Sequence, residues 1–143
     1  MTASSTCNQF VGIVDEVNVG AINAEVYISL KGGEVIVASI TKQSIENLAI
    51  QKGNEVLALV NPSQVIIVTD FGGYRLSARN QLQGTITNIT YGEVGSIVEI
   101  KLKNDQLISV AVTNECIESL ILRKEQLVTA LFKAGAVILG LPK

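Results

Sequence analysis

The residues most able to do chemistry form a short polar segment, Ser77-Ala78-Arg79-Asn80-Gln81, just before an apolar run. Arg79 brings a planar fork of N–H donors that stays charged at any cellular pH, and Ser77 adds a hydroxyl donor. Donors of this kind suit a compact oxyanion, so the segment predicts an anion-binding site at the edge of a strand. The alternative interpretation is that Arg79 is a solvated surface charge, because arginine is rarely buried without a partner.

The composition argues against several other kinds of site. The chain has no histidine, and its two cysteines, Cys7 and Cys116, lie far apart without a CxxC spacing, so neither a zinc site nor a disulfide framework is expected. An enzyme is disfavoured because the most common general base and metal ligand is missing. A formal net charge of −2 and 4% aromatic residues give no basic patch or stacking platform, so we expect no nucleic-acid partner.

The apolar content predicts a soluble, β-rich oligomer. Hydrophobic residues make up 48% of the 143 residues, and most of them are Val, Ile, Leu and Ala, which favours strands. A domain of half this length buries only about 60% of the surface that its unfolded chain exposes, so the surplus should pack between domains or subunits. No run is long and apolar enough to span a bilayer, and Met1-Thr2-Ala3-Ser4 lacks the features of a secretion signal. We therefore expect a cytoplasmic protein with no membrane partner.

The second half of the chain repeats the first. When Asn8-Gln9 is placed over Asn80-Gln81, an offset of 72 residues, the register continues without a gap to the end. An unbroken register of this length indicates duplication. The sequence therefore predicts two domains, residues 1–70 and residues 71–143. Identical pairs in this register include Gly12/Gly84, Gly20/Gly92, Val26/Val98, Ile28/Ile100, Thr41/Thr113, Ile45/Ile117, Val56/Val128, Ala58/Ala130 and Leu59/Leu131.

Each repeat predicts the same series of short elements. Alternating apolar and polar residues indicate half-buried strands, and Gly-bearing segments between them indicate turns. A threonine followed by apolar residues at helical spacing predicts a short helix with Thr41 as its N-cap. Five strands and one small helix predict an all-β fold of two tandem OB-like five-stranded barrels. In the first repeat the strands are expected at 10–17, 24–30, 34–40, 56–59 and 65–68, and the helix at 41–48.

Three segments together resemble the molbindins, a family of cytoplasmic proteins built of Mop domains, which are TOBE-like. These segments are the linker at residues 70–81, the turn at residues 20–26 and the closing stretch at residues 132–140, and the resemblance extends over nearly the whole chain. It implies tandem Mop domains in a homotrimer. It also implies that molybdate or tungstate is held at interfaces between Mop domains, for storage or homeostasis rather than for chemical conversion.

The resemblance implies two classes of oxyanion site. The chemistry agrees, since a tetrahedral dianion is balanced by one Arg and one Lys while hydroxyl and backbone N–H groups add neutral donors. No metal-ligating side chain is required. The first class, shared across an interface, corresponds here to Ser77, Ala78, Arg79, Lys133, Ala134, Thr41 and Ser44; the second, on a threefold axis, corresponds to the turn Gly20, Ala21, Ile22, Asn23 and Ala24.

Each repeat departs from the family pattern at different positions. Cys7 stands in place of the arginine and Asn61 in place of the lysine in the first repeat, while Cys116 replaces the helix-start serine in the second. The turn Gly92–Ser96 also departs, and Glu93 would repel an anion if it faced the axis. Either the halves complement one another, with Arg79 and Lys133 facing the Thr41 helix start, or the missing groups mark decay. We expect fewer sites than in a full molbindin.

Structural explanations compete with each assignment. Thr41 caps a helix whatever else it does, Gly20 is a turn glycine, and Lys133 could be a surface lysine. The cysteines are expected to be inert small residues. At the level of the whole protein, the alternative is a Mop-barrel structural or interaction module in which oxyanion binding is weakened or lost. An enzyme on the same scaffold is a remoter alternative.

Overall fold

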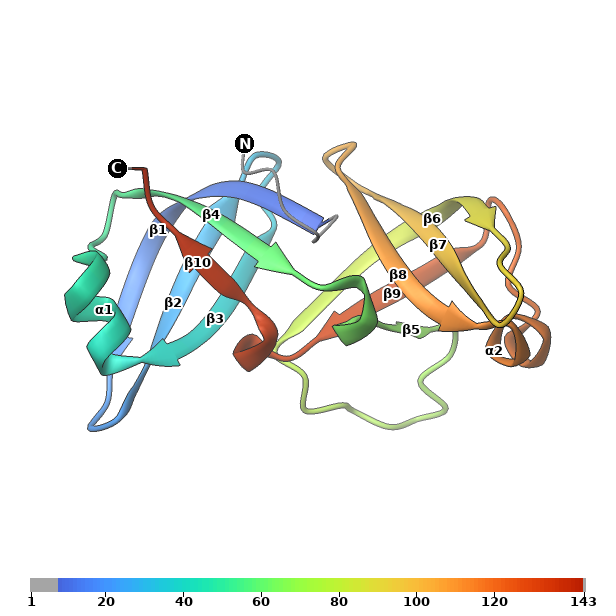
Figure 1. Ribbon diagram of the computed structural model, residues 1–143, viewed down its shortest axis with the longest axis horizontal. Coiled ribbons are helices and arrows are strands. Elements are labelled where there is room, and N and C mark those ends of the chain that lie inside the picture. The colour runs from blue at the N-terminus through green and yellow to red at the C-terminus, as the bar shows by residue number, and fades with distance from the viewer. Residues whose placement is uncertain (1–7, 143) are drawn as a thin grey trace. The chain divides into compact units, whose positions relative to one another are not determined.

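The computed structural model describes residues 8–142, which form two antiparallel sheets and a few short helices (Figure 1). The all-β class with one short α-helix per repeat is confirmed. The elements are β1 (Asn8–Val19), β2 (Asn23–Leu30), β3 (Val35–Thr41), α1 (Lys42–Leu48), β4 (Glu55–Val60), η1 (Pro62–Gln64), β5 (Ile66–Val68), β6 (Asn80–Thr90), β7 (Gly95–Leu102), β8 (Leu107–Thr113), α2 (Asn114–Leu120), β9 (Leu127–Phe132), η2 (Ala134–Ala136) and β10 (Ile138–Gly140), where η1 and η2 are 3-10 helices.

The chain folds into two compact units, which we call unit 1 and unit 2. Unit 1 contains the described residues up to Val60 together with those from Lys133 onward, and unit 2 contains Asn61–Phe132. Each unit holds one five-stranded sheet, with the strand order β10-β4-β1-β2-β3 in unit 1 and β5-β9-β6-β7-β8 in unit 2. In unit 1 the edge strands β10 and β3 contact each other and η2 packs on β3, which closes the sheet on itself.

The fifth strand of each sheet comes from the other repeat. β10, at the end of the second repeat, pairs with β4 of unit 1, and β5, at the end of the first repeat, pairs with β9 of unit 2. Five strands per barrel were predicted correctly, but the expectation that each repeat closes its own barrel is wrong. Residues 1–70 and 71–143 thus describe the sequence repeats, whereas the compact units exchange their last strands.

Alternating burial builds the two cores as the sequence predicts. Along β2 every second residue from Ala24 to Leu30 is buried, and β7 repeats the pattern from Ser96 to Leu102. The repeats place their large aromatic side chains differently, since Phe10 is buried on β1 in unit 1 and Phe132 on β9 in unit 2. Each core therefore receives one phenylalanine, from non-equivalent strands.

A shared glycine and a shared bulge show how closely the repeats keep one backbone. A Cβ added at Gly12 would lie 2.6 Å from the Ser29 carbonyl oxygen, and one added at Gly84 would lie 2.6 Å from the Lys101 carbonyl oxygen. Neither position can therefore accept a side chain without moving the neighbouring strand. Two residues further along, both first strands change register, between Val14 and Glu16 and at the corresponding point of β6.

Both α-helices begin and end in the same way. Thr41 and Thr113 are N-caps whose side chains accept a hydrogen bond from the backbone N–H of the third residue on, as predicted. Each helix ends at a residue with positive φ, Ala49 in α1 and Ile121 in α2. This conformation is costly for a β-branched side chain, so α2 carries strain that α1 largely avoids.

Candidate oxyanion sites

Two basic residues flank the same end of the β6–β9 ladder. Asn80 and Phe132 form the last pair of this antiparallel ladder, with Arg79 directly before Asn80 and Lys133 directly after Phe132. Asn80 is only 1% exposed, so the backbone beside Arg79 is firmly held. The two basic residues therefore flank one residue pair of the ladder, although they are 54 positions apart in the chain.

The segment before β6 is tied to the first turn of that strand. The Gln81 side chain donates from Nε2 to the carbonyl oxygens of Leu76 and Ala78, at 3.1 Å in each case. These two hydrogen bonds to the backbone hold Ser77 and Ala78 close to the strand, and Ser77 is exposed. Gln81, which the sequence analysis placed in the candidate segment, thus acts as a support for it.

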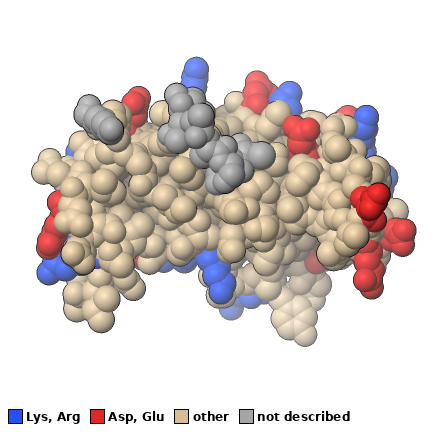
Figure 2. Space-filling view, in the orientation of Figure 1, with Lys and Arg blue, Asp and Glu red and all other residues tan. Residues whose placement is uncertain are grey.

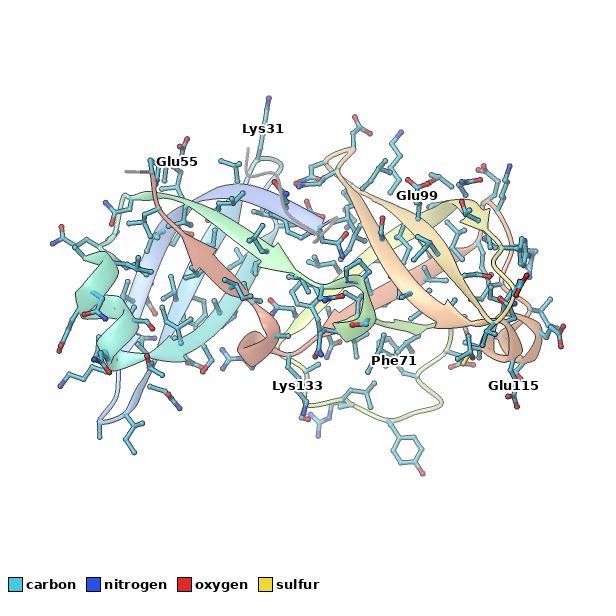
Figure 3. The ribbon with its side chains drawn as sticks, viewed as in Figure 1. Lys31, Glu55, Phe71, Glu99, Glu115 and Lys133 are labelled. Atoms are coloured by element: carbon cyan, nitrogen blue, oxygen red, sulfur yellow. The ribbon has the colours of Figure 1, made fainter. Side chains whose placement is uncertain are left out.

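Lys133 carries its charge into solvent beside unit 1. It precedes η2, which packs on β3, and it occupies the N-cap position without any side-chain capping bond (Figure 3). Among residues 8–142 its ammonium group has no hydrogen-bond or ion-pair partner. Ala134, the next residue, is buried and anchors the turn. The lysine is therefore held by its backbone while its charge remains available to a ligand.

The corresponding end of the β1–β4 ladder lacks this pair of charges. Its last pair is Asn8 and Val60, and Asn61 follows directly. Asn61 caps η1, accepting from the Ser63 backbone N–H at 3.1 Å and from the Ser63 hydroxyl at 3.0 Å. The residue at the predicted cation position thus has a structural role that the sequence analysis did not foresee. Cys7 lies outside the described residues.

The helix start of unit 1 offers a pair of hydroxyl groups. The Thr41 hydroxyl donates to the Ser44 hydroxyl at 2.9 Å and accepts from the Ser44 backbone N–H at 3.1 Å. This arrangement uses the Thr41 proton and leaves the Ser44 proton able to donate elsewhere. In unit 2 Cys116 retains only the backbone bond to Thr113, so the second hydroxyl is missing there.

The turn Gly20–Ala24 lies beside this helix start in unit 1. Asn23 is paired with Thr41 across β2 and β3, and the Lys42 backbone N–H donates to the Ile22 carbonyl oxygen at 2.8 Å. The turn and the hydroxyl pair, which the sequence analysis assigned to two classes of site, are thereby brought to one end of unit 1. The side chains of Asn23 and Lys42 have no partner among residues 8–142.

Unit 1 and unit 2 therefore divide the predicted site residues between them. Unit 1 holds Lys133, Ala134, Thr41, Ser44 and the turn Gly20–Ala24, and unit 2 holds Ser77, Ala78 and Arg79.

Sequence reasoning missed Ser96 and Asn114, which bind the turn of unit 2 through their side chains. A polar residue at position 96, where the strand alternation places a core residue, was the available signal.

Other kinds of site find no support in the part of the chain that the structure describes. Residues 8–142 contain no group of three or more His, Cys, Asp or Glu side chains that could hold a metal ion. The same residues include no helix with the length and hydropathy needed to cross a bilayer.

Comparison with known proteins identifies the class of the chain. The TOBE domain family matches it twice, at residues 4–67 and 76–139. Because these matches cover most of the sequence, the chain belongs to the TOBE domain family. The resemblance to proteins with tandem Mop domains is confirmed.

A solved structure is similar over the full length of the chain. This is the cytoplasmic molybdate-binding protein ModG, in a PEG-grown form with molybdate bound, which is 40% identical, with a TM-score of 0.96 over 99% of this chain and 100% of that chain.

Curated relatives include the molybdenum transport protein ModE of Herbaspirillum seropedicae, 36% identical over 137 residues. That match covers 96% of this chain and 51% of the relative. The molybdenum-pterin-binding protein MopA of Rhodobacter capsulatus is 36% identical over 129 residues, or 90% of this chain and 49% of the relative. The chain thus spans about half the length of these curated relatives.

Proposed function

We propose that this chain binds molybdate or tungstate as an intact oxyanion and serves molybdenum storage or homeostasis. The observation that supports the proposal is that Arg79 directly precedes, and Lys133 directly follows, the last residue pair of the β6–β9 ladder, Asn80 and Phe132. Support comes from the full-length likeness to ModG with molybdate bound. An arginine and a lysine together balance a dianion, and charge-assisted hydrogen bonds from both are stronger than neutral ones.

The first site combines these cations with neutral donors. Ser77 adds a hydroxyl beside the guanidinium, and the free proton of Ser44 adds another from the helix start. A pocket of donors alone favours fully deprotonated oxyanions, because the O–H of hydrogen phosphate would need an acceptor. Sulfate must then be excluded from the site by its size. The proposed set is Ser77, Ala78, Arg79, Lys133, Ala134, Thr41 and Ser44.

A homotrimer completes the proposal. In it, each oxyanion lies at an interface between Mop domains, and a second class of site uses the turn Gly20–Ala24. The exposed side chain of Ile22, 76% accessible at the tip of this turn, is the kind of apolar surface that an interface would cover. Gel filtration with light scattering should give a mass near three chains.

The remaining assignments follow from the same chemistry. We assign no catalytic role, since the donor set offers no general base and the oxyanion leaves as it entered. The net charge of −2 gives no electrostatic drive toward nucleic acid. A cytoplasmic location, as in ModG, and the absence of a membrane partner complete the assignment.

A second candidate function is a structural or interaction module of the same fold. The observation that favours it is the replacement of ligand-type groups by Asn61, whose side chain caps η1, and by Cys116, which keeps only the backbone bond to Thr113. In that case the barrels serve assembly and oxyanion binding is weak.

Isothermal titration calorimetry with molybdate, tungstate, sulfate and phosphate tests the proposal. Wild-type protein should bind the first two and not the others, and Arg79→Ala should weaken binding about a hundredfold by removing a charged donor. Arg75→Ala is the matched control, since Arg75 is an exposed arginine of the same linker. Equal binding by wild type, Arg79→Ala and Arg75→Ala would refute the assigned site, and no binding by wild type would favour the structural module.

A further inference from the structure

The turn of unit 2 is held shut by a side-chain network that we call the Asn114 clasp, made of Asn114, Ser96, Gly92 and Glu93. Asn114 Nδ2 donates to the carbonyl oxygens of Gly92 at 2.9 Å and Glu93 at 3.2 Å. Asn114 Oδ1 accepts from the Ser96 hydroxyl, and Ser96 Oγ in turn accepts from the Gly92 backbone N–H at 3.3 Å. The clasp thus joins the first residue of α2 to both ends of the turn.

The clasp uses every side-chain donor that it contains. The two protons of the Asn114 amide go to two carbonyl oxygens, and the Ser96 proton goes to Asn114. Ser96 is only 4% exposed, so a competing ligand could reach its hydroxyl only by opening the turn. An oxyanion at this turn would therefore find that the side-chain donors of the clasp are already engaged.

The backbone of this turn is also tighter than its counterpart. A Cβ added at Gly92 would lie 2.3 Å from the Gly95 carbonyl oxygen, whereas one added at Gly20 would lie 3.0 Å from the Asn23 carbonyl oxygen. The shorter approach leaves less room between the two ends of the unit 2 turn. The hydrogen bonds of Asn114 and the close packing at Gly92 both reduce the space for a ligand at this turn.

The charges near the clasp are unfavourable to an anion. Glu93 lies in the turn and Glu115 follows Asn114 on α2, where Figure 2 shows acidic side chains gathered and Figure 3 labels Glu115. The shallow groove beside the turn, about 490 Å³, includes Tyr91, Ile97 and Val112 and no cation in its lining.

Unit 1 has neither the clasp nor the acidic charges at this turn. Ala24 stands at the position of Ser96 and Lys42 at that of Asn114, and neither side chain bridges the turn. Instead the Gly20 backbone N–H donates to the Asn23 carbonyl oxygen at 2.8 Å. The amide of Asn23 and the ammonium group of Lys42 remain without partners among residues 8–142, and both are exposed donors.

We infer that the Asn114 clasp replaces the ligand in unit 2 and confines turn-type oxyanion binding to unit 1, with Lys42 supplying the charge there. The inference rests on the proposed function, since it assigns one class of its sites to one of the two units. Asn114 and Ser96 are positioning residues that determine where the anion binds, and Lys42 is an additional anion-binding residue.

Transfer of the clasp into unit 1 tests this assignment. Ala24→Ser combined with Lys42→Asn reproduces the unit 2 residues, with each new polar group given its partner. Calorimetric titration of the full chain with molybdate should show the turn class of site weakened at least tenfold, because a charged donor is lost and the turn is closed. Lys52→Asn is the matched control, because it removes an exposed lysine of unit 1 far along the chain from the turn.

The possible outcomes separate this inference from the proposed function. Loss of one class of site in the double variant, with the class sensitive to Arg79→Ala retained, supports the inference. Titrations that are the same for wild type, the double variant and the Lys52→Asn control overturn it, while leaving the Arg79 site standing. Absence of molybdate binding by wild type overturns both.

A second measurement needs no ligand and tests the clasp itself. In Asn114→Ala the backbone N–H groups of residues 91–96 should exchange with deuterium at least tenfold faster than in wild type, because the bonds across the turn are gone. Lys42→Ala should leave exchange in the unit 1 turn unchanged. Unaltered protection of residues 91–96 in Asn114→Ala would overturn the role given to the clasp.

Discussion

The two units have the same backbone plan but use equivalent positions for different purposes. At the end of the β6–β9 ladder, Arg79 precedes β6 and Lys133 follows β9, whereas the position matching Lys133 is Asn61, which caps a 3-10 helix. At the turn the relation is reversed, since the Lys42 side chain of unit 1 has no partner among residues 8–142 while Asn114 closes the turn of unit 2.

This comparison distinguishes two uses of equivalent positions. Asn61 and Asn114 satisfy nearby backbone groups through their side chains. Such a residue stabilises its own unit, whereas Lys133 is proposed to contribute to a ligand complex. Stability and affinity should therefore respond to different members of each equivalent pair.

The largest expected effect is on stability and concerns the glycine that both units share in their first strand. Gly84→Ala should lower the free energy of unfolding by about 3 kcal/mol, since its Cβ would meet a backbone carbonyl that cannot move aside. Gly12→Ala should cost a similar amount, because the approach to the neighbouring carbonyl is 2.6 Å in both units. Urea denaturation measures both. The control is Gly135→Ala, where an added Cβ meets nothing within 4 Å; a loss there as large as at Gly84 would contradict the steric explanation.

The next effect separates affinity from stability at the ladder ends. Lys133→Gln should weaken molybdate binding about a hundredfold through loss of a charged donor and leave stability unchanged. Asn61→Ala should do the reverse, with affinity unchanged and the free energy of unfolding lowered by about 1 kcal/mol through the lost cap. Calorimetry and urea denaturation of both variants measure the two effects. A loss of affinity in Asn61→Ala equal to that in Lys133→Gln would show that the two positions still have one function.

The smallest effect concerns the helix ends. Ile121→Gly should raise the free energy of unfolding by about 1 kcal/mol, because glycine relieves a β-branched residue at φ 52°. Ile121 is 69% exposed, so little packing is lost. Ala49→Gly should give a smaller gain at the matching position. Thermal denaturation followed by circular dichroism checks the order, and a destabilised Ile121→Gly protein would mean that this side chain is covered in the assembled protein.

Much of the fold could be predicted from local patterns. Alternation along β2 and β7 and the threonine caps depend on neighbouring residues, and the structure confirms them. The strand exchange could not be predicted, because the two acceptor strands are nearly interchangeable. β4 and β9 share Ala58/Ala130 and Leu59/Leu131, so the apolar pattern of β5 fits either.

The candidate site was predictable in its residue types but not in its assembly. Arg79 and Lys133 flank the pair formed by Asn80 and Phe132, and that register depends on contacts distant in sequence. The clasp was missed because Ser96 and Asn114 lie on different elements, and their bond forms only after β7 and β8 have paired.

The exchanged strands make the duplication indivisible. Excision of either repeat would strip one edge from the surviving sheet and leave a short orphan strand, β5 or β10, with unpaired backbone groups in solvent. Two such fragments could repair each other by trading these strands, which requires a bimolecular encounter. Fusion of the repeats converts that encounter into an intramolecular step with a high effective concentration. Each repeat thus supplies, on the same polypeptide, the last strand of the other repeat's sheet.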